Sequence, residues 1–138
     1  MKHIVCAIFF RDQQVLLGKR AAHKSVNPNC WDLIGGHIEP GETPELALVR
    51  EAEEEVGLTP VRLVPAGTLF QSEPDLYGAA TYHLFTVSEW NGVEPQMLGS
   101  EHTEIGWFTI QEACALEPLA RAEYRALFMS LSAGCLDF

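Results

Sequence analysis

The sequence has few cysteines and no long apolar segment. Its four cysteines, Cys6, Cys30, Cys114 and Cys135, show neither C-x-x-C spacing nor the density of a disulfide scaffold, so we expect free thiols that mostly serve as packing residues. The longest apolar run, residues 4–10, is far too short to cross a bilayer, and no small-residue cleavage site follows it. These features predict a cytoplasmic protein without membrane contact.

Basic residues are also scarce, since 9 Lys and Arg stand against 19 Asp and Glu, which gives a net charge of −10 at pH 7. So acidic a chain argues against binding to nucleic-acid polymers or to an anionic membrane surface. If the substrate is nonetheless an anion, metal ions and a few local basic residues must offset the repulsion between the substrate and the negatively charged chain. Hydrophobic content of 47% with 20% charged residues is that of a folded globular chain.

The chain contains no internal repeat, no low-complexity tract and no Pro/Gly/Ser-rich linker. At 138 residues it is long enough to bury roughly two thirds of its unfolded surface in one hydrophobic interior. We therefore expect a single domain that spans residues 1–138.

Strand-like and helix-like segments alternate along this domain. A polar turn, Arg11-Asp12-Gln13, joins the first two strands as a hairpin. The expected strands are 3–10, 14–20, 31–34, 61–71, 80–90 and 104–110. Thr43 as N-cap, Pro44 in the first turn and Gly57 as C-terminal stop predict a helix over residues 44–56, and residues 118–131 read as a closing helix. The fold class is therefore α+β or α/β layered, a mixed β-sheet flanked by helices.

Four glutamates occupy five consecutive positions near the end of the first helix. At ~100° per residue, Glu51, Glu54 and Glu55 share one arc of the helix surface, whereas Glu53 points elsewhere. The neighbouring arc is apolar and forms the expected core face, Leu48, Val49, Ala52 and Val56. Like charges this close repel one another. The run is therefore either a solvated acidic face or a site for a cation.

The residues before the glutamate run favour the second interpretation, a cation site. The string GHIEPGETPELALVREAEEEVGL begins at Gly36 and follows the pattern G-x5-E-x7-R-E-U-x-E-E-x-G-U at every fixed position, where U is aliphatic. Ala52, at the first U, is smaller than the usual leucine or isoleucine but still apolar. The chain resembles the Nudix hydrolases, and more loosely their MutT-type branch, over nearly its whole length.

This resemblance implies an α/β/α layered Nudix-type fold and hydrolysis of a nucleoside diphosphate linked to another group X, with water attacking a phosphorus. It also implies Mg²⁺ or Mn²⁺, because Mg²⁺ bridges carboxylates to phosphates. The matching metal ligands are Glu51, Glu54, Glu55 and the carbonyl group of Gly36. Glu42 and Arg50 match the residues that brace the loop against the helix in the family, although both could be plain charges on the helix rim.

A general base is the next requirement. Glu101 lies six residues before Trp107, the spacing of a loop glutamate that ligates metal or acts as base in MutT-like members. Glu54 and Glu51 are competitors for this role, and Glu104 is a weaker neighbour. The alternative for Glu101 is a solvated loop carboxylate.

Basic and histidine residues complete the expected phosphate side. Arg20 matches a phosphate-contacting arginine of MutT-type proteins, and Lys19 precedes it at the end of the second strand, where a charge that simply meets water is the alternative. His37, in the expected loop after Gly36, is either a phosphate contact or a surface histidine. His83 faces either the cleft or the sheet.

The sequence says little about the identity of the group X or of the nucleobase of the substrate. MutT-type oxidised-guanine hydrolases use an asparagine after the last strand, and the comparable stretch here, EPLARAEY, has none. Aromatic residues could stack a base or serve as core: Trp31, Phe70, Tyr77 and Tyr82. The alternatives are an ADP-sugar, dinucleoside polyphosphate or non-nucleotide diphosphate hydrolase, or a non-catalytic Nudix binding or sensor module. A homodimer is left open.

Overall fold

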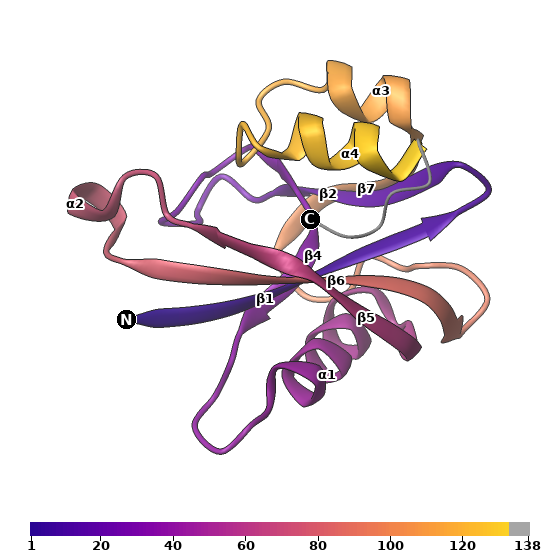
Figure 1. The fold of residues 1–138 in the computed structure, drawn as a ribbon, viewed down its shortest axis with the longest axis horizontal. Helices are drawn as coiled ribbons and strands as arrows, with labels where there is room; N and C mark the ends of the chain where they lie inside the picture. The colour runs from indigo at the N-terminus through magenta and orange to yellow at the C-terminus, as the bar shows by residue number, and fades with distance from the viewer. Residues whose placement is uncertain (133–138) are drawn as a thin grey trace.

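The computed structural model of the chain describes residues 1–132. In chain order the elements are β1 (Lys2–Arg11), β2 (Gln14–Arg20), β3 (Trp31–Asp32), β4 (Ile34–His37), α1 (Pro44–Val56), β5 (Thr59–Phe70), α2 (Pro74–Tyr77), β6 (Ala80–Asn91), β7 (His102–Thr109), α3 (Ile110–Ala115) and α4 (Tyr124–Ser132). Figure 1 shows α1 on one side of the strands and α3 with α4 on the other. This arrangement confirms the predicted layered α+β fold with a mixed sheet.

Strand β1 connects the two parts of the sheet. It pairs in parallel with β6 and antiparallel with β4, and β5 pairs antiparallel with the other edge of β6. The end of β1 forms a hairpin with β2, whose turn residues Asp12 and Gln13 have positive φ angles of 52° and 62°. Strand β2 in turn pairs with β3 and β7. The candidate site lies beside β2, β3 and β4, next to the point where the two parts of the sheet meet at β1.

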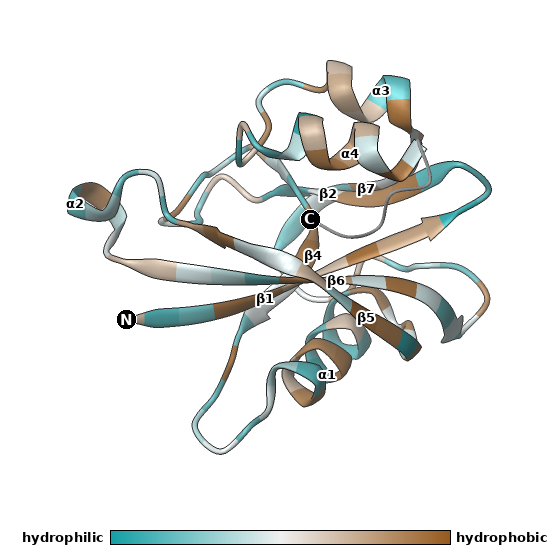
Figure 2. Ribbon diagram, in the orientation of Figure 1, coloured by the Kyte–Doolittle hydropathy of each residue, from teal (hydrophilic) through white to brown (hydrophobic). Residues whose placement is uncertain are grey.

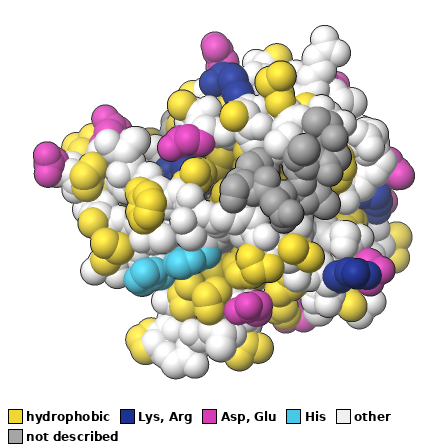
Figure 3. All heavy atoms as spheres, viewed as in Figure 1, with side chains coloured by type: hydrophobic (Ala, Val, Ile, Leu, Met, Phe, Trp, Pro, Cys, Tyr) yellow, Lys and Arg dark blue, Asp and Glu magenta, His cyan; other side chains and the backbone are white. Residues whose placement is uncertain are grey.

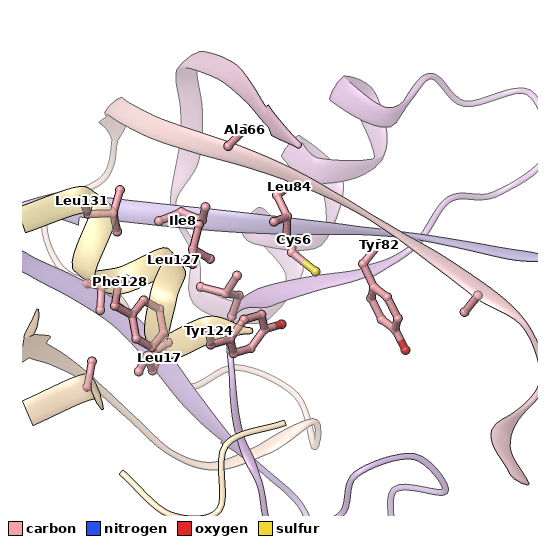
Figure 4. Packing of buried hydrophobic residues seen from close by; sticks show 14 residues of the cluster. Cys6, Ile8, Leu17, Ala66, Tyr82, Leu84, Tyr124, Leu127, Phe128 and Leu131 are labelled. Carbon is pink, nitrogen blue, oxygen red and sulfur yellow. The ribbon is translucent and has the colours of Figure 1, made fainter. Parts of the chain in front are cut away.

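Alternate residues of β1 face opposite layers, as the period of a strand requires. Cys6 and Ile8 pack in one hydrophobic cluster with residues of α4, whereas Val5, Ala7 and Phe9 pack in a second cluster with α1. Figure 4 shows the first cluster, with Leu127, Phe128 and Leu131 of α4 against Ile8 and Leu17. Figure 2 shows hydrophobic residues along β1 and in the helices on both sides of it.

Helix α1 begins and ends where the sequence predicts. The hydroxyl group of Thr43 accepts a hydrogen bond from the backbone N–H of Leu46 at 3.2 Å, and Pro44 occupies the first turn. Gly57 ends the helix in the left-handed conformation at φ 71°, and its N–H bonds to the carbonyl of Glu53 at 3.2 Å. The buried face holds Ala47, whereas Val49, expected in the core, is only half-buried.

Other boundaries differ from the expectation. The segment 31–34 is not one strand, because β3 pairs with β2 while β4 pairs with β1. His37 is the last residue of β4 rather than a loop residue. The expected strand 104–110 ends at Thr109, where α3 begins, and the expected closing helix 118–131 starts only at Tyr124. Helix α2 was not anticipated.

Two further expectations concern the described residues. Cys6, Cys30 and Cys114 are free thiols, as predicted, and Cys135 lies outside the described residues. Within residues 1–132, no helix combines the length and apolar character needed to span a membrane. Figure 3 shows hydrophobic side chains scattered among charged ones over one face, with histidine side chains lying next to each other.

Candidate active site

One cavity of about 190 Å³ collects most of the predicted site residues. Its wall is formed by the end of β2, by β3 and β4, by the side of α1, by the start of β7 and by the loop of residues 21–30. Arg20, Gly36, His37, Glu51, Glu55 and Glu101 all line it. The fold thus gathers residues from separate parts of the chain around one space.

The acidic wall of the cavity depends on close contact between β4 and α1. A Cβ atom added at Gly36 would lie 2.4 Å from the carboxyl carbon of Glu51. Any side chain at this position would therefore push the carboxylate away. Burial raises the pKa of Glu51, and the nearby Glu54 and Glu101 act in the same direction, while Arg50 opposes them.

Glu55 is the most deeply placed of these carboxylates, with only 6% of its surface exposed. Burial raises its pKa to about 9, and the charges of Glu51 and Glu101 contribute. Its Oε2 atom is fully buried and has no hydrogen-bond partner among the residues that the structure describes. An unpartnered buried carboxylate costs stability unless a ligand compensates it.

Arg50 ties the loop before α1 to the helix. Its guanidinium donates to both carboxylate oxygens of Glu42, at 2.8 and 2.9 Å, and to the backbone carbonyl of His37 at 3.0 Å. It also donates to Glu51 at 2.9 Å. Because one planar group holds the loop, β4 and α1 together, Arg50 and Glu42 are placed to brace the acidic wall.

Glu54 and Glu53 lie on the outer side of α1. The side chain of Glu54 is 60% exposed and accepts a hydrogen bond from Arg50 at 3.4 Å, but it does not line the cavity. Glu53 is exposed and accepts a hydrogen bond from the hydroxyl of Thr59 at 2.8 Å. The predicted arc is therefore divided, with Glu51 and Glu55 inside the cavity and Glu54 outside it.

Glu101 is the residue just before β7, and it lines the cavity. Lys24 donates a hydrogen bond to its carboxylate, which lowers the pKa of Glu101. The loop of residues 21–30 is also held by Arg20, whose Nε atom donates to the carbonyl of Val26 at 2.9 Å. Arg20 lies 3.6 Å from a carboxylate oxygen of the buried Asp32. The cations thus occupy the wall next to the carboxylates.

Several candidate residues lie elsewhere. Lys19, on β2, does not line the cavity, nor do Trp31 and Phe70. Trp31 packs edge-on against Phe108, 5.1 Å between ring centroids, and Phe70 is 64% exposed. His83, on β6, pairs with His3 of β1 at 3.0 Å and does not line this cavity, so it is the satisfied sheet residue and not the cleft residue of the two expectations.

Other cavity residues were not anticipated as site residues. Lys24, Asp32 and His102 come from a loop, from the two-residue strand β3 and from the start of β7. Arg121 and Gln71 complete this group. None of them belongs to a spaced motif, although Arg121 lies in the stretch EPLARAEY, which was compared with the base-contacting region of MutT-type hydrolases. Tyr77 and Tyr82, expected either to stack a base or to serve as core residues, do line the cavity.

The donor set suits a hard divalent cation. Within residues 1–132, no three His, Cys, Asp or Glu side chains converge closely enough to hold a metal ion by themselves. The Oε2 atom of Glu55 is nevertheless unpartnered within these described residues, and the carboxylate of Glu51, one oxygen of which accepts from Arg50, lines the same cavity. Mg²⁺ binds through one or two carboxylates and completes its ligands with water and substrate phosphate. The residues therefore fit Mg²⁺.

Comparison with known proteins decides the family. A model of the NUDIX domain matches residues 1–130. The chain belongs to the Nudix family. A CTP pyrophosphohydrolase of Escherichia coli is 32% identical over 137 residues, which cover 97% of this chain and 96% of the relative. This match and the family model support the prediction of a Nudix hydrolase that acts on phosphoric anhydrides.

Two further relatives show how broad this Nudix fold is. An isopentenyl-diphosphate Delta-isomerase of Streptomyces griseus is 33% identical over 137 residues, 94% of this chain and 67% of the relative. The crystal structure of a MutT NUDIX hydrolase from Burkholderia pseudomallei superposes with a TM-score of 0.82 at 25% identity, covering 93% of this chain and 95% of that one. The fold is thus shared by Nudix proteins with different named activities.

Proposed function

We propose that this Nudix protein is a Mg²⁺- or Mn²⁺-dependent pyrophosphohydrolase that cleaves a nucleoside diphosphate linked to X, with nucleoside triphosphates as the first substrate class. One observation carries the proposal: the carboxylates of Glu51, Glu55 and Glu101 line the same cavity as the cations Arg20 and Lys24. Such a cavity can hold metal-neutralised phosphates in a chain whose net charge is otherwise −10.

Glu51, Glu55 and the carbonyl of Gly36 would hold the metal from the cavity wall, and Glu54, exposed outside the cavity, would join them by turning its side chain toward the metal. When bound, the metal supplies charge neutralisation of the phosphates and a water of lowered pKa. The chain's own part is to keep these ligands in place, and Arg50 does so through its hydrogen bonds to Glu51 and to the loop.

Glu101 is our candidate for the general base. Its carboxylate is ionised beside Lys24, and it lines the cavity from a loop that is separate from α1. Glu51 and Glu54 compete for the role, and all three carboxylates are paired with a cation, Lys24 for Glu101 and Arg50 for the other two. Arg20, whose guanidinium borders the cavity, would bind a phosphate oxygen and so orient the anhydride for attack. His37 lines the same wall as a further phosphate contact.

The nucleoside triphosphate class is supported by the E. coli CTP pyrophosphohydrolase, because that match extends over nearly the full length of both chains. ADP-sugars, dinucleoside polyphosphates and non-nucleotide diphosphates use the same chemistry and remain the alternatives. The cellular setting we propose is the cytoplasm, with a small phosphorylated molecule as the partner and a homodimer as one assembly.

A phosphate-release screen tests the proposal. Purified protein with Mg²⁺ or Mn²⁺ is offered nucleoside triphosphates, ADP-ribose, sugar nucleotides and diadenosine polyphosphates, and the products are separated and identified. We expect a nucleoside monophosphate and pyrophosphate from at least one triphosphate, and no turnover in excess chelator. Full activity in chelator would end the metal assignment. Metal binding without turnover on any diphosphate would instead support a non-catalytic binding module.

A further inference from the structure

Arg121 is a buried cation for which the reaction at the metal site gives no use. It lies between α3 and α4, only 8% of its surface is exposed, and it lines the cavity. Its guanidinium carbon lies 3.5 Å from the centre of the Tyr82 ring. Tyr82 is held in turn by Gln71, whose amide donates to the tyrosine hydroxyl at 3.1 Å. Figure 4 shows Tyr82 at one end of the hydrophobic cluster.

The Nε atom of the Arg121 guanidinium is fully buried and has no hydrogen-bond acceptor among residues 1–132. Arg20, by contrast, donates to Val26 and lies near Asp32. Stacking on the Tyr82 ring returns part of the free energy that burial of the guanidinium costs, but the ring supplies no hydrogen-bond acceptor to Nε. The arrangement is therefore suited to a ligand that brings the acceptors.

The neighbouring charges define which acceptors fit. Asp32 is buried in the same cavity, where its Oδ1 atom accepts hydrogen bonds from Tyr124 at 2.6 Å and from the N–H of Leu33 at 2.7 Å. Arg20, 3.6 Å from Asp32, offsets part of this negative charge, and the remainder makes a neutral group more favourable than a second phosphate next to Arg121. A planar guanidinium fork instead matches two adjacent neutral acceptors on the edge of a flat ring.

We propose that Arg121 selects the nucleobase, donating two parallel N–H bonds to a base that has two adjacent acceptors on one edge. Cytosine offers N3 and O2, and guanine offers N7 and O6. Adenine places an amino group beside N7, and the carbonyl groups of uracil flank an N–H, so neither presents such a pair. Arg121 is thus a specificity-determining residue for cytosine and guanine nucleotides.

This inference rests on the proposed function, because it assumes that the cavity takes a nucleotide. Its test therefore has one arm that needs no hydrolysis. Binding of CMP, GMP, AMP and UMP to metal-free protein is measured by calorimetry, and kcat and KM are measured for the four triphosphates with Mg²⁺. Wild-type protein, Arg121→Met and Arg121→Lys are compared, with Arg62→Met as control, since Arg62 is exposed on β5 outside the cavity.

We expect wild-type protein to bind CMP and GMP ~10- to ~100-fold more tightly than AMP and UMP, the discrimination typical of one bidentate contact. Arg121→Met should abolish this preference through KM, with an unchanged or higher thermal midpoint, because methionine keeps the packing on Tyr82. Arg121→Lys should not restore the preference, since it keeps the charge but not the fork. Arg62→Met should match wild type.

Three results would overturn the assignment. The first is wild-type protein that binds all four monophosphates equally. The second is an equal loss across all four nucleotides in Arg121→Met, which indicates a phosphate contact. The third is full rescue by Arg121→Lys, which indicates a structural charge. If no triphosphate is hydrolysed but the monophosphate preference follows Arg121, the proposed function fails and this inference stands.

Discussion

Glu54 and Glu55 are neighbours in the sequence but lie in opposite environments, since 6% of the surface of Glu55 and 60% of the side chain of Glu54 are exposed. The spacing i, i+3, i+4 could predict that they share an arc with Glu51. It could not predict which part of that arc β4 covers. That depends on the contact of Gly36 with Glu51, which is set by tertiary packing.

The adjacent glutamates give a direct test at the residue scale. Glu54→Gln should lower kcat by ~10²–10³, the usual loss for one well-placed electrostatic partner, because it removes a metal-binding charge and keeps the shape. Glu53→Gln should have almost no effect, since Glu53 is exposed and bonds only to Thr59 among the described residues. Steady-state kinetics and thermal midpoints, with and without Mg²⁺, are measured for both variants. Equal damage from both would contradict the helix register of the site.

Lys24 and Arg121 are cavity residues that could not be predicted from the sequence. Both line the cavity, yet each lies in an irregular segment without a spaced motif. Periodicity places residues on one element, whereas these two reach the cavity only because the chain returns to it from distant segments. Arg20 could be predicted as a site residue because it ends a strand and matches the position of a phosphate-contacting arginine in MutT-type proteins.

At the scale of elements, α1 was predictable because its signals are local: an N-cap, a proline in the first turn and a glycine stop. Helix α3 also carries a local signal, since Thr109 and Glu112 form a capping box. The apolar strand pattern that runs up to Thr109 concealed it. The division of residues 31–34 between β3 and β4 has no local signal, because it depends on two different partner strands.

The link between α1 and its preceding loop should depend on pH. The hydrogen bonds from Arg50, and then the N–H of Glu39, lower the pKa of Glu42 to about 2. A lowered folded-state pKa contributes stability that is complete above the unfolded-state pKa, about 4.5, and is lost as the pH falls towards 2. Glu42→Gln should therefore be less stable than wild type at pH 6, and the difference should shrink below about pH 4.5.

Denaturant unfolding of metal-free protein across this pH range measures the effect. Glu123→Gln is the matched control, because Glu123 is exposed and lies far along the chain from the loop. The control should track wild type at every pH. A Glu42→Gln difference that stays constant down to pH 2 would show that Arg50 does not depend on the charge of Glu42.

The whole molecule distributes its few cations unevenly. Of the nine Lys and Arg residues in the sequence, four line the cavity: Lys2, Arg20, Lys24 and Arg121. Composition alone predicted that an anionic substrate would need such a local concentration. It could not say which cations would meet, because they come from β1, β2, a loop and the segment before α4. Because four carboxylates, Asp32, Glu51, Glu55 and Glu101, line the same cavity, these four cations balance the formal negative charge of its wall.

Metal binding should be visible in the stability of the whole fold. Without metal, the buried Oε2 atom of Glu55 has no partner within residues 1–132, so Glu55→Gln should raise the thermal midpoint of metal-free protein. Mg²⁺ at 100 times its Kd should stabilise wild-type protein by about 2.7 kcal/mol and Glu55→Gln by much less, because only the folded state presents the site. Glu53→Gln, with its exposed carboxylate, should keep the full Mg²⁺ shift. Scanning calorimetry with Mg²⁺ or chelator gives both quantities. An equal Mg²⁺ shift in wild type and Glu55→Gln would remove Glu55 from the metal site, whereas a lower metal-free midpoint would show that its carboxyl group supports the fold.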